Sequence, residues 1–249
     1  MSWGSSQHNL KLSDDGSYTA FSKEYDEHYH STKDGALKES LLKHVCPAFL
    51  VKHNLDEINI LDICYGLGFN TLSTLLHVRE NYPTYRVNIY SPELDASLID
   101  SLKDFIYPKE FEAFREIILA LSQDKVYQCG TLRVEIFVGD AREYVKRFSD
   151  KFDIVYQDAF SPSANPVLWT KEYFSDIKKA MKKDGVLTTY STALKTRLAL
   201  YENGFNIYIN SGEEFRDATV ASQVELDKFL HVDMKHKISC NPNIEPLRD

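Results

Sequence analysis

The stretch from Ile58 to Asn70, "INILDICYGLGFN", decides how this chain folds. Its first residues are apolar and β-branched, as in a buried strand. Gly66 and Gly68 follow, and residues 71–82 then carry apolar side chains at helical spacing. Strand, glycine loop and helix in this order are typical of the first unit of an open α/β sheet, where the loop lets a ligand approach the backbone.

Strands and helices alternate downstream of this unit. We expect strands at residues 86–95, 132–141, 152–160, 185–191, 205–209 and 218–226. We expect helices at residues 97–106, 109–123, 142–148, 171–183 and 194–203, the fourth capped by Thr170 and ending before Asp184 and Gly185. The alternation predicts βαβ units and a mostly parallel, doubly wound sheet, which is an α/β fold of the Rossmann-like kind.

The two ends of the chain depart from this alternation. Residues 1–55 are predicted to be an N-terminal extension, with a small hairpin at 17–30 and a helix at 35–51, that packs over one end of the sheet. Residues 56–224 form the predicted α/β domain, and residues 225–249 a polar C-terminal tail laid on the surface.

Composition limits the class of protein. The chain has 249 residues, of which 43% are hydrophobic, so it can bury a core. A net charge of −8 argues against binding nucleic acid by bulk charge, although it leaves room for a local basic patch. The four cysteines form no CxxC pair, and no signal segment or membrane span is visible. We therefore expect a cytoplasmic protein without a metal site and without a membrane partner.

Three acids lie at the carboxyl ends of predicted strands: Glu93, Asp140 and Asp158. Because the carboxyl ends of parallel strands meet at one sheet edge, these acids are expected near the glycine loop. Glu93 has the spacing of an acid that accepts ribose hydroxyls, with Asp95 as the alternative. Asp140 either accepts an adenine amino proton or caps the next helix, or does both.

The kind of ligand follows from what surrounds these acids. The glycine loop carries no GKS or GKT sequence, so a triphosphate is not expected. An acid-rich pocket suits an adenosine ligand that has positive charge and no phosphate. S-adenosylmethionine, with its sulfonium and α-amino groups, has this chemistry.

Two later segments, "DAFSPSANPVLWTKEYF" (158–174) and "GVLTTYSTALKTRLALYENGF" (185–205), resemble the MnmC-like methyltransferases of the tRNA 5-methylaminomethyl-2-thiouridine pathway. The matching positions are Asp158, Phe160, Pro162, Asn165, Pro166, Trp169, Thr170, Gly185, Thr189, Tyr190, Ala193, Gly204 and Phe205. An earlier segment, "YDEHYHSTKDGALKES" (25–40), is similar to the same family at Tyr29, Gly35 and Glu39.

The resemblance implies a class I S-adenosylmethionine-dependent methyltransferase that N-methylates 5-aminomethyl-2-thiouridine at the wobble position of tRNA. It implies S-adenosylmethionine as cofactor and, because the family's oxidase domain does not follow, no flavin. The implied cofactor-binding residues are Tyr29, Glu39, Asp62, Gly66, Gly68, Asn70, Glu93, Asp140 and Asp158. The implied transfer-site residues are Asp158, Phe160 and Pro162, where Asp158 or the carbonyls of residues 159–162 would align the acceptor amine.

The sequence also departs from the family. Cys64 replaces the first glycine of the loop, which must therefore turn at a residue that has a Cβ. Basic residues near the end are reduced to Arg197 and Arg216. Three alternatives stay open: a methyltransferase for another RNA or a small amine, a nicotinamide-dependent oxidoreductase, and a catalytically silent binding module.

Overall fold

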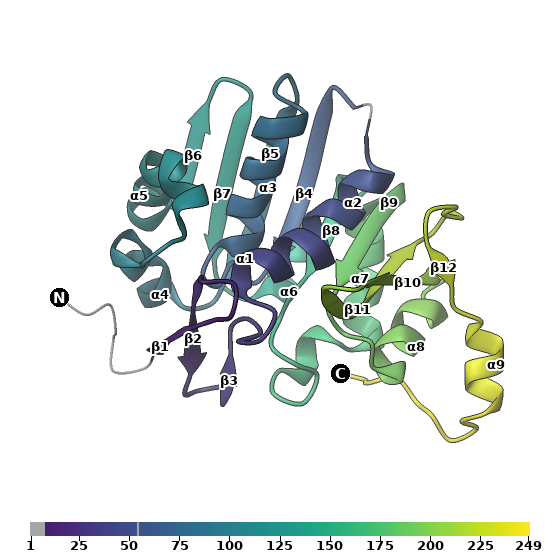
Figure 1. The fold of residues 1–249 in the computed structure, drawn as a ribbon. Helices are drawn as coiled ribbons and strands as arrows, with labels where there is room; N and C mark the ends of the chain where they lie inside the picture. The colour runs from purple at the N-terminus through teal and green to yellow at the C-terminus, as the bar shows by residue number, and fades with distance from the viewer. Residues whose placement is uncertain (1–7, 54) are drawn as a thin grey trace.

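A nine-stranded sheet runs through the computed structural model, which describes residues 8–53 and 55–249 (Figure 1). Its parallel strands are β4 (Glu57–Ile63), β5 (Arg86–Glu93), β7 (Leu132–Val138), β8 (Phe152–Gln157) and β9 (Met181–Thr189). Its antiparallel strands are β6 (Val126–Cys129), β10 (Asn206–Gly212), β11 (Phe215–Ser222) and β12 (Leu230–His231). The order is β12-β10-β11-β9-β8-β4-β5-β7-β6, and the predicted α/β class is confirmed.

The direction of winding reverses between β4 and β8. From β4 the chain passes to β5 and β7 on one side, and then returns to β8 and β9 on the other. In an open α/β sheet, ligands bind in the crevice at the carboxyl ends of the strands beside such a reversal. This topology therefore selects the ends of β4 and β8 as the place for a site.

Helices cover both faces of the sheet. They are α3 (Phe69–Asn81), α4 (Ala96–Ser101), α5 (Arg115–Asp124), α6 (Ala141–Val145), α7 (Lys171–Ala180) and α8 (Leu194–Glu202). Short 3-10 turns at Leu102–Asp104 and Lys109–Phe114 replace parts of two expected helices, and a further one, at Pro166–Leu168, precedes α7. The predicted cap is confirmed, because the Thr170 hydroxyl accepts a hydrogen bond from the Tyr173 N–H over 3.1 Å.

The helix predicted at 171–183 was too long. α7 ends at Ala180, and the buried Met181 already pairs with Phe152 as the first residue of β9. The next pair joins Ile154 to Val186, so residues 182–185 bulge opposite Asp153 alone. A bulge with two lysines and a glycine resembles a helix end in sequence, which explains the error.

Residues 8–53 form a second, smaller sheet and a helical segment (Figure 1). Strands β1 (His8–Leu12), β2 (Tyr18–Ser22) and β3 (Glu27–His28) are antiparallel, and β2 and β3 form the expected hairpin. The helix expected at 35–51 is continuous but changes type, as α1 (Ala36–Glu39), the π-helical turn η1 (Ser40–Val45) and α2 (Cys46–Val51). The η1 turn contacts α3, β9 and β11.

The C-terminal residues return to the main domain. After β12, whose two residues pair with β10, a last helix α9 spans Met234–Ser239. The Lys171 N–H at the start of α7 donates to the Leu247 carbonyl over 2.9 Å. Val232 and Met234 are buried, so the segment expected as a polar tail also contributes apolar side chains to the core.

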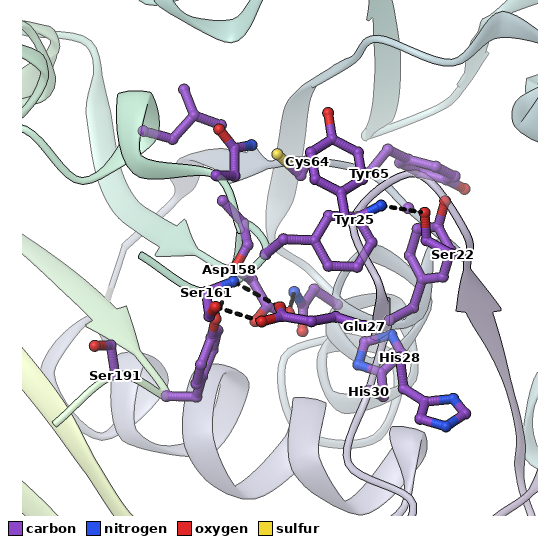
Figure 2. Close-up of a pocket in the computed structure, with 18 of the residues that line it drawn as sticks. Ser22, Tyr25, Glu27, His28, His30, Cys64, Tyr65, Asp158, Ser161 and Ser191 are labelled. Atoms are coloured by element: carbon purple, nitrogen blue, oxygen red, sulfur yellow. Dashed lines mark hydrogen bonds between the residues drawn. The ribbon is translucent and has the colours of Figure 1, made fainter. Parts of the chain in front are cut away.

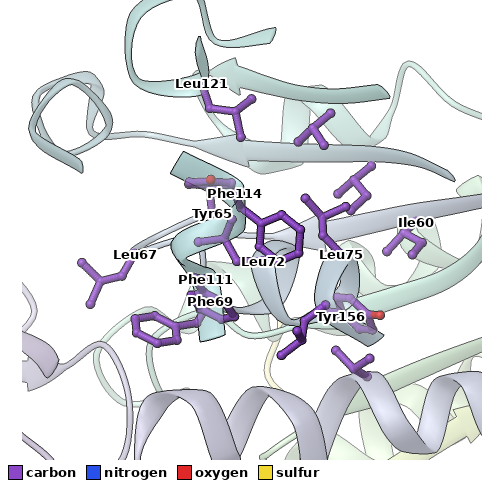
Figure 3. Close-up of a cluster of buried hydrophobic side chains, with 14 of the residues drawn as sticks. Ile60, Tyr65, Leu67, Phe69, Leu72, Leu75, Phe111, Phe114, Leu121 and Tyr156 are labelled. Atoms are coloured by element: carbon purple, nitrogen blue, oxygen red, sulfur yellow. The ribbon is translucent and has the colours of Figure 1, made fainter. Parts of the chain in front are cut away.

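Apolar packing fixes α3 on the sheet next to the glycine loop (Figure 3). Ile60 and Tyr156 from adjacent strands lie against Leu72 and Leu75 of α3, and all four are buried. Removing one such leucine side chain costs about 2–5 kcal/mol in other proteins. The loop that begins α3 is therefore held by a rigid element at both ends.

Candidate functional site

A cavity of about 1610 Å³ opens at the carboxyl ends of the parallel strands (Figure 2). Its walls come from residues 22–34 of the extension, the glycine loop, the end of β5, residues 139–142 and residues 158–161. Eight of the sequence-predicted site residues line it: Tyr29, Glu39, Gly66, Asn70, Glu93, Asp140, Asp158 and Phe160. Asp62, Gly68 and Pro162 do not line it.

The glycine loop turns in the left-handed region of backbone conformation. Gly66 and Gly68 have φ of 53° and 78°, and Gly68 immediately precedes α3. A Cβ on Gly66 would lie 3.2 Å from the Tyr29 ring, so the glycine lets the extension close over the loop. Cys64 also has a positive φ, 65°, and carries its side chain through the turn at some cost in strain.

Glu93 ties this loop to the end of β5. Its carboxylate accepts hydrogen bonds from the backbone N–H groups of Gly66 over 2.9 Å, and of Leu94 and Asp95 over 2.8 and 2.9 Å. Burial raises the pKa of Glu93 despite these three donors. Asp95, the alternative from the sequence, instead caps α4 by accepting from the N–H groups of residues 97 and 98.

Asp140 caps α6. Its carboxylate accepts from the Arg142 N–H over 2.8 Å and forms an ion pair with the Arg142 guanidinium over 2.9 Å. The Arg142 hydrogen bond lowers the pKa of Asp140. The helix-capping interpretation is therefore confirmed, and any contact with adenine stays a prediction.

Asp158 lies one residue beyond β8, at the point where the winding reverses. Its Oδ2 accepts a hydrogen bond from the Asn70 side chain over 2.8 Å, and its Oδ1 lies 3.4 Å from His44 Nε2. Burial alone would raise its pKa, but His44, His30 and Asn70 outweigh burial and lower the pKa to about 2. Asp158 is thus a firmly ionised carboxylate facing the cavity.

Side chains of the N-terminal extension contact the loop that follows Asp158. Glu27 of the extension accepts hydrogen bonds from the Ser161 N–H over 2.9 Å and from its hydroxyl (Figure 2). The Tyr25 ring stacks on Phe160 with centroids 4.5 Å apart. The extension and the loop therefore form one wall of the cavity.

Two of the loop carbonyls that were expected from the sequence to align an amine already accept a hydrogen bond from a side chain. The Tyr190 hydroxyl donates to the Ala159 carbonyl over 2.9 Å, and the Trp169 indole donates to the Phe160 carbonyl over 2.7 Å. Trp169 is fully buried in the core. Of the groups expected to align an amine, the Asp158 carboxylate is the charged one that lines the cavity.

Asp62 is the second-last residue of β4 and does not line the cavity. Its side chain is fully buried and accepts a hydrogen bond from the Thr71 hydroxyl over 2.8 Å, while Oδ1 has no partner among the described residues. Burial raises its pKa to about 7. Asp62 therefore binds the first turn of α3.

Buried charges beside the cavity were not expected from the sequence. Lys43 forms ion pairs with Asp34 and Glu39 over 2.8 and 2.9 Å, and the Glu39 carboxylate also accepts from the Ser31 N–H. His30 lies 3.8 Å from Glu39, and burial lowers its pKa. One signal was present: Glu39 and Lys43 are four residues apart in a helix whose other residues are mainly apolar.

No group of three His, Cys, Asp or Glu side chains within residues 8–53 and 55–249 is arranged to hold a metal ion. In the same part of the chain, no helix combines the length and hydrophobicity that a membrane span requires.

The comparisons with known proteins agree with this geometry. Residues 109–223 match a family model described as S-adenosyl-L-methionine-dependent methyltransferase. The crystal structure of MnmC2 from Aquifex aeolicus superposes with a TM-score of 0.85 at 33% identity, covering 97% of this chain and 79% of that one.

Two curated relatives are longer than this chain. An uncharacterised protein of Methanocaldococcus jannaschii is 33% identical over 204 residues, which are 81% of this chain and 55% of the relative. The tRNA 5-methylaminomethyl-2-thiouridine biosynthesis bifunctional protein MnmC of Leptospira interrogans is 25% identical over 247 residues, covering 89% of this chain. The match spans only 36% of that bifunctional protein.

A class I fold with its glycine loop, strand-end acids and cavity at the switch point defines an S-adenosyl-L-methionine-dependent methyltransferase. Within this class, the chain is 33% identical to the MnmC2 structure from Aquifex aeolicus and covers 79% of it, which is enough to assign the family. The chain belongs to the MnmC-like methyltransferase family.

Proposed function

We propose that this methyltransferase transfers a methyl group to the primary amine of 5-aminomethyl-2-thiouridine at the wobble position of tRNA. The observation that carries the proposal is the position of Asp158, an ionised carboxylate in the same cavity as Glu93 and the glycine loop. The name of the Leptospira relative, a tRNA 5-methylaminomethyl-2-thiouridine biosynthesis protein, supports the choice of acceptor.

The residues around the loop fit an adenosine ligand with an amino acid tail. Glu93 would accept the ribose hydroxyl protons, and Asp140 would accept an adenine amino proton beside its Arg142 pair. Asn70 has a buried Oδ1 with no partner among the described residues, which would accept from the α-ammonium group. Tyr29 would close over the loop at Gly66, while Asp62 and Gly68 would support the loop rather than touch the ligand.

When bound, S-adenosylmethionine supplies an electrophilic methyl group on a sulfonium centre. The protein's own part is to hold the amine in line, exclude water and keep the amine neutral. Asp158 accepts a hydrogen bond from the amine and so directs its lone pair into the cavity. With a pKa of about 2, a carboxylate is a weak final proton acceptor at neutral pH.

Phe160 and Pro162 would shape the transfer site. The Phe160 ring contacts those of Tyr25 and Tyr29, with centroids 4.5 and 5.0 Å away, and this aromatic cluster would offer a stacking surface to a flipped uridine. Pro162 would stiffen the loop from outside the cavity. Glu39 would act through its buried pairs by fixing the turn at Ser31.

Contact with the tRNA backbone would fall to few basic residues. Arg216 is exposed at the cavity and suits a phosphate contact. Arg197 donates to the Thr219 hydroxyl over 3.0 Å and is half-buried, so it suits such a contact less well. This proposal places the enzyme in the cytoplasm, where tRNA is modified, and assigns the methyltransferase activity to residues 56–224. Residues 1–55 are the extension that completes the cavity, and 225–249 the C-terminal segment.

The second candidate is transfer to another RNA or to a small amine, and the net charge of −8 favours it. Incorporation of labelled methyl from S-adenosylmethionine into four acceptors separates the two. The acceptors are tRNA carrying 5-aminomethyl-2-thiouridine, the same tRNA without the aminomethyl group, unmodified ribosomal RNA, and a free primary amine. We expect label in the first alone, and equal label in the free amine would transfer the assignment to the second candidate.

A further inference from the structure

His44 is a buried histidine that joins the cavity to the interior of the sheet. It lies in η1, and its side chain is 0% exposed. Its Nδ1 lies 3.1 Å from the Thr188 hydroxyl on β9, and its Nε2 lies 3.4 Å from Asp158 Oδ1. The imidazole thus connects the carboxylate that faces the cavity with a hydroxyl behind it.

This arrangement is not explained by packing alone. Nε2 is within ion-pair distance of Asp158, yet it has no hydrogen-bond partner among the described residues. Folded proteins rarely keep a buried ring nitrogen unpaired. The turn that carries His44 is π-helical, a rare form that is frequently found at functional sites.

The surroundings of the imidazole limit what it can exchange protons with. The ring lies edge-on to Tyr156, with centroids 5.8 Å apart. The titratable groups that interact electrostatically with His44 are Asp158 just beyond β8, Asp62 from β4 and His30 from the extension. Lys43, the residue before His44 in the same helix, is paired with both Glu39 and Asp34. Of these groups, Asp158 both lies within ion-pair distance of the imidazole and lines the cavity.

This inference rests on the proposed amine acceptor. We propose that Asp158 removes a proton from the acceptor ammonium and that His44, acting through Asp158 as a positioning residue, takes up this proton. A primary alkylammonium, like that of lysine, keeps its proton up to about pH 10. Imidazole is the side chain that exchanges a proton near neutral pH, whereas a salt-bridged carboxylate is a poor store for one. The pair therefore divides the work, since Asp158 contacts the amine and His44 holds the proton.

The step balances as follows. The ammonium N–H gives one proton to Asp158, which passes it to His44 Nε2, and the acceptor nitrogen is left with a lone pair. That lone pair forms the new N–C bond to the methyl group while the C–S bond breaks, and its electron pair stays on sulfur. The product is a secondary ammonium that keeps two protons on nitrogen, and His44 returns its proton through Asp158 to solvent in the cavity before the next turnover.

The first test compares methyl transfer by the full chain between pH 6 and 10, on tRNA carrying 5-aminomethyl-2-thiouridine. His44→Gln keeps a polar group near Asp158 that cannot be protonated in this range. We expect its turnover to fall about 10²-fold at pH 7 and to approach wild type at pH 10, where the amine loses its proton unaided. Equal loss at every pH would indicate a structural role and overturn the proposal. His53→Gln, at an exposed histidine, is the matched control and should follow wild type.

A second readout needs no acceptor. Nitrogen-15 NMR of the histidine rings identifies the His44 signal by its loss in His44→Gln, and Asp158→Asn should then shift the titration of that signal. Thr188→Val, which keeps the imidazole, should shift it as well and serves if His44→Gln does not fold. If the titration of the His44 signal is the same in Asp158→Asn as in wild type, the proposed proton transfer from Asp158 to His44 is overturned. If Asp158→Asn shifts the His44 signal but the enzyme does not methylate this tRNA, the result supports the pair of His44 and Asp158 and overturns only the proposed acceptor.

Discussion

The Glu93 carboxylate accepts a hydrogen bond from the Gly66 backbone N–H over 2.9 Å, and so fastens the glycine loop after β4 to the end of β5. The same carboxylate accepts from two further backbone N–H groups, of Leu94 and Asp95. An acid held by three backbone donors has a fixed direction. Glu93 is therefore oriented before any ligand arrives, which lowers the entropy cost of binding.

Replacing Glu93 with alanine should weaken S-adenosylmethionine binding. The change removes a charged acceptor of ligand hydroxyl groups, each worth about 1.5–3 kcal/mol, and it frees the loop. We expect the dissociation constant from calorimetric titration to rise about 10- to 100-fold. Glu112→Ala, at an exposed acid on the 3-10 turn, should leave it unchanged. Unaltered affinity in the Glu93 variant would remove this residue from the site.

Replacing Asp158 with asparagine should affect turnover much more than cofactor affinity. The variant keeps the size of the side chain and loses the charge that aligns the amine. We expect kcat to fall at least about 10²-fold and the dissociation constant for S-adenosylmethionine to change by less than about 3-fold. Asp227→Asn, at an exposed acid, is the control. Equal losses in both quantities would make Asp158 a binding or structural residue.

Asp62 should make the stability of the fold depend on pH. Its pKa is raised by burial from 3.8 to about 7, so the stability it contributes is complete below 3.8 and is lost as the pH rises through about 7. Urea unfolding at pH 5 and pH 8 gives the free energy of unfolding at each. We expect it to fall from pH 5 to pH 8 more in wild type than in Asp62→Asn. The same pH dependence in both proteins would show that Asp62 is ionised in the fold.

Replacing Cys64 with glycine should change the stability of the fold little, whereas replacing it with a β-branched residue should destabilise the fold. At a φ of 65°, glycine relieves strain but loses more entropy on folding, so Cys64→Gly should change the free energy of unfolding by less than about 1 kcal/mol. Cys64→Val should lower it by at least about 1–2 kcal/mol. Cys129→Val, in the exposed strand β6, is the control because β-branched residues suit strands. Equal effects at both positions would show that the turn at Cys64 carries no strain.

The parts of the fold that depend on local pattern could be predicted from the sequence. β4, the glycine loop and α3 follow one another within 25 residues, and each has its own signal. The meeting of Glu93, Asp140 and Asp158 at one cavity also followed, because parallel strands end at a common edge. The bulge before Val186 did not follow, because its sequence matches a helix end as well as a strand.

The buried polar part of the site depends on long-range contacts. His44 meets Thr188, which is 144 residues further along the chain, and nothing near either residue indicates the other. Glu27 was likewise invisible as a partner of Ser161, 134 residues away. Such pairs are set by how the extension docks on the sheet, and tertiary packing of this kind leaves no periodic trace in sequence.

The most direct test of the central claim is nucleoside analysis by mass spectrometry after one turnover on tRNA that carries 5-aminomethyl-2-thiouridine. The account predicts that this nucleoside gives way to 5-methylaminomethyl-2-thiouridine, with one S-adenosylhomocysteine formed for each methyl group transferred. Unchanged nucleosides, in the presence of an enzyme that binds S-adenosylmethionine, would contradict the proposed acceptor.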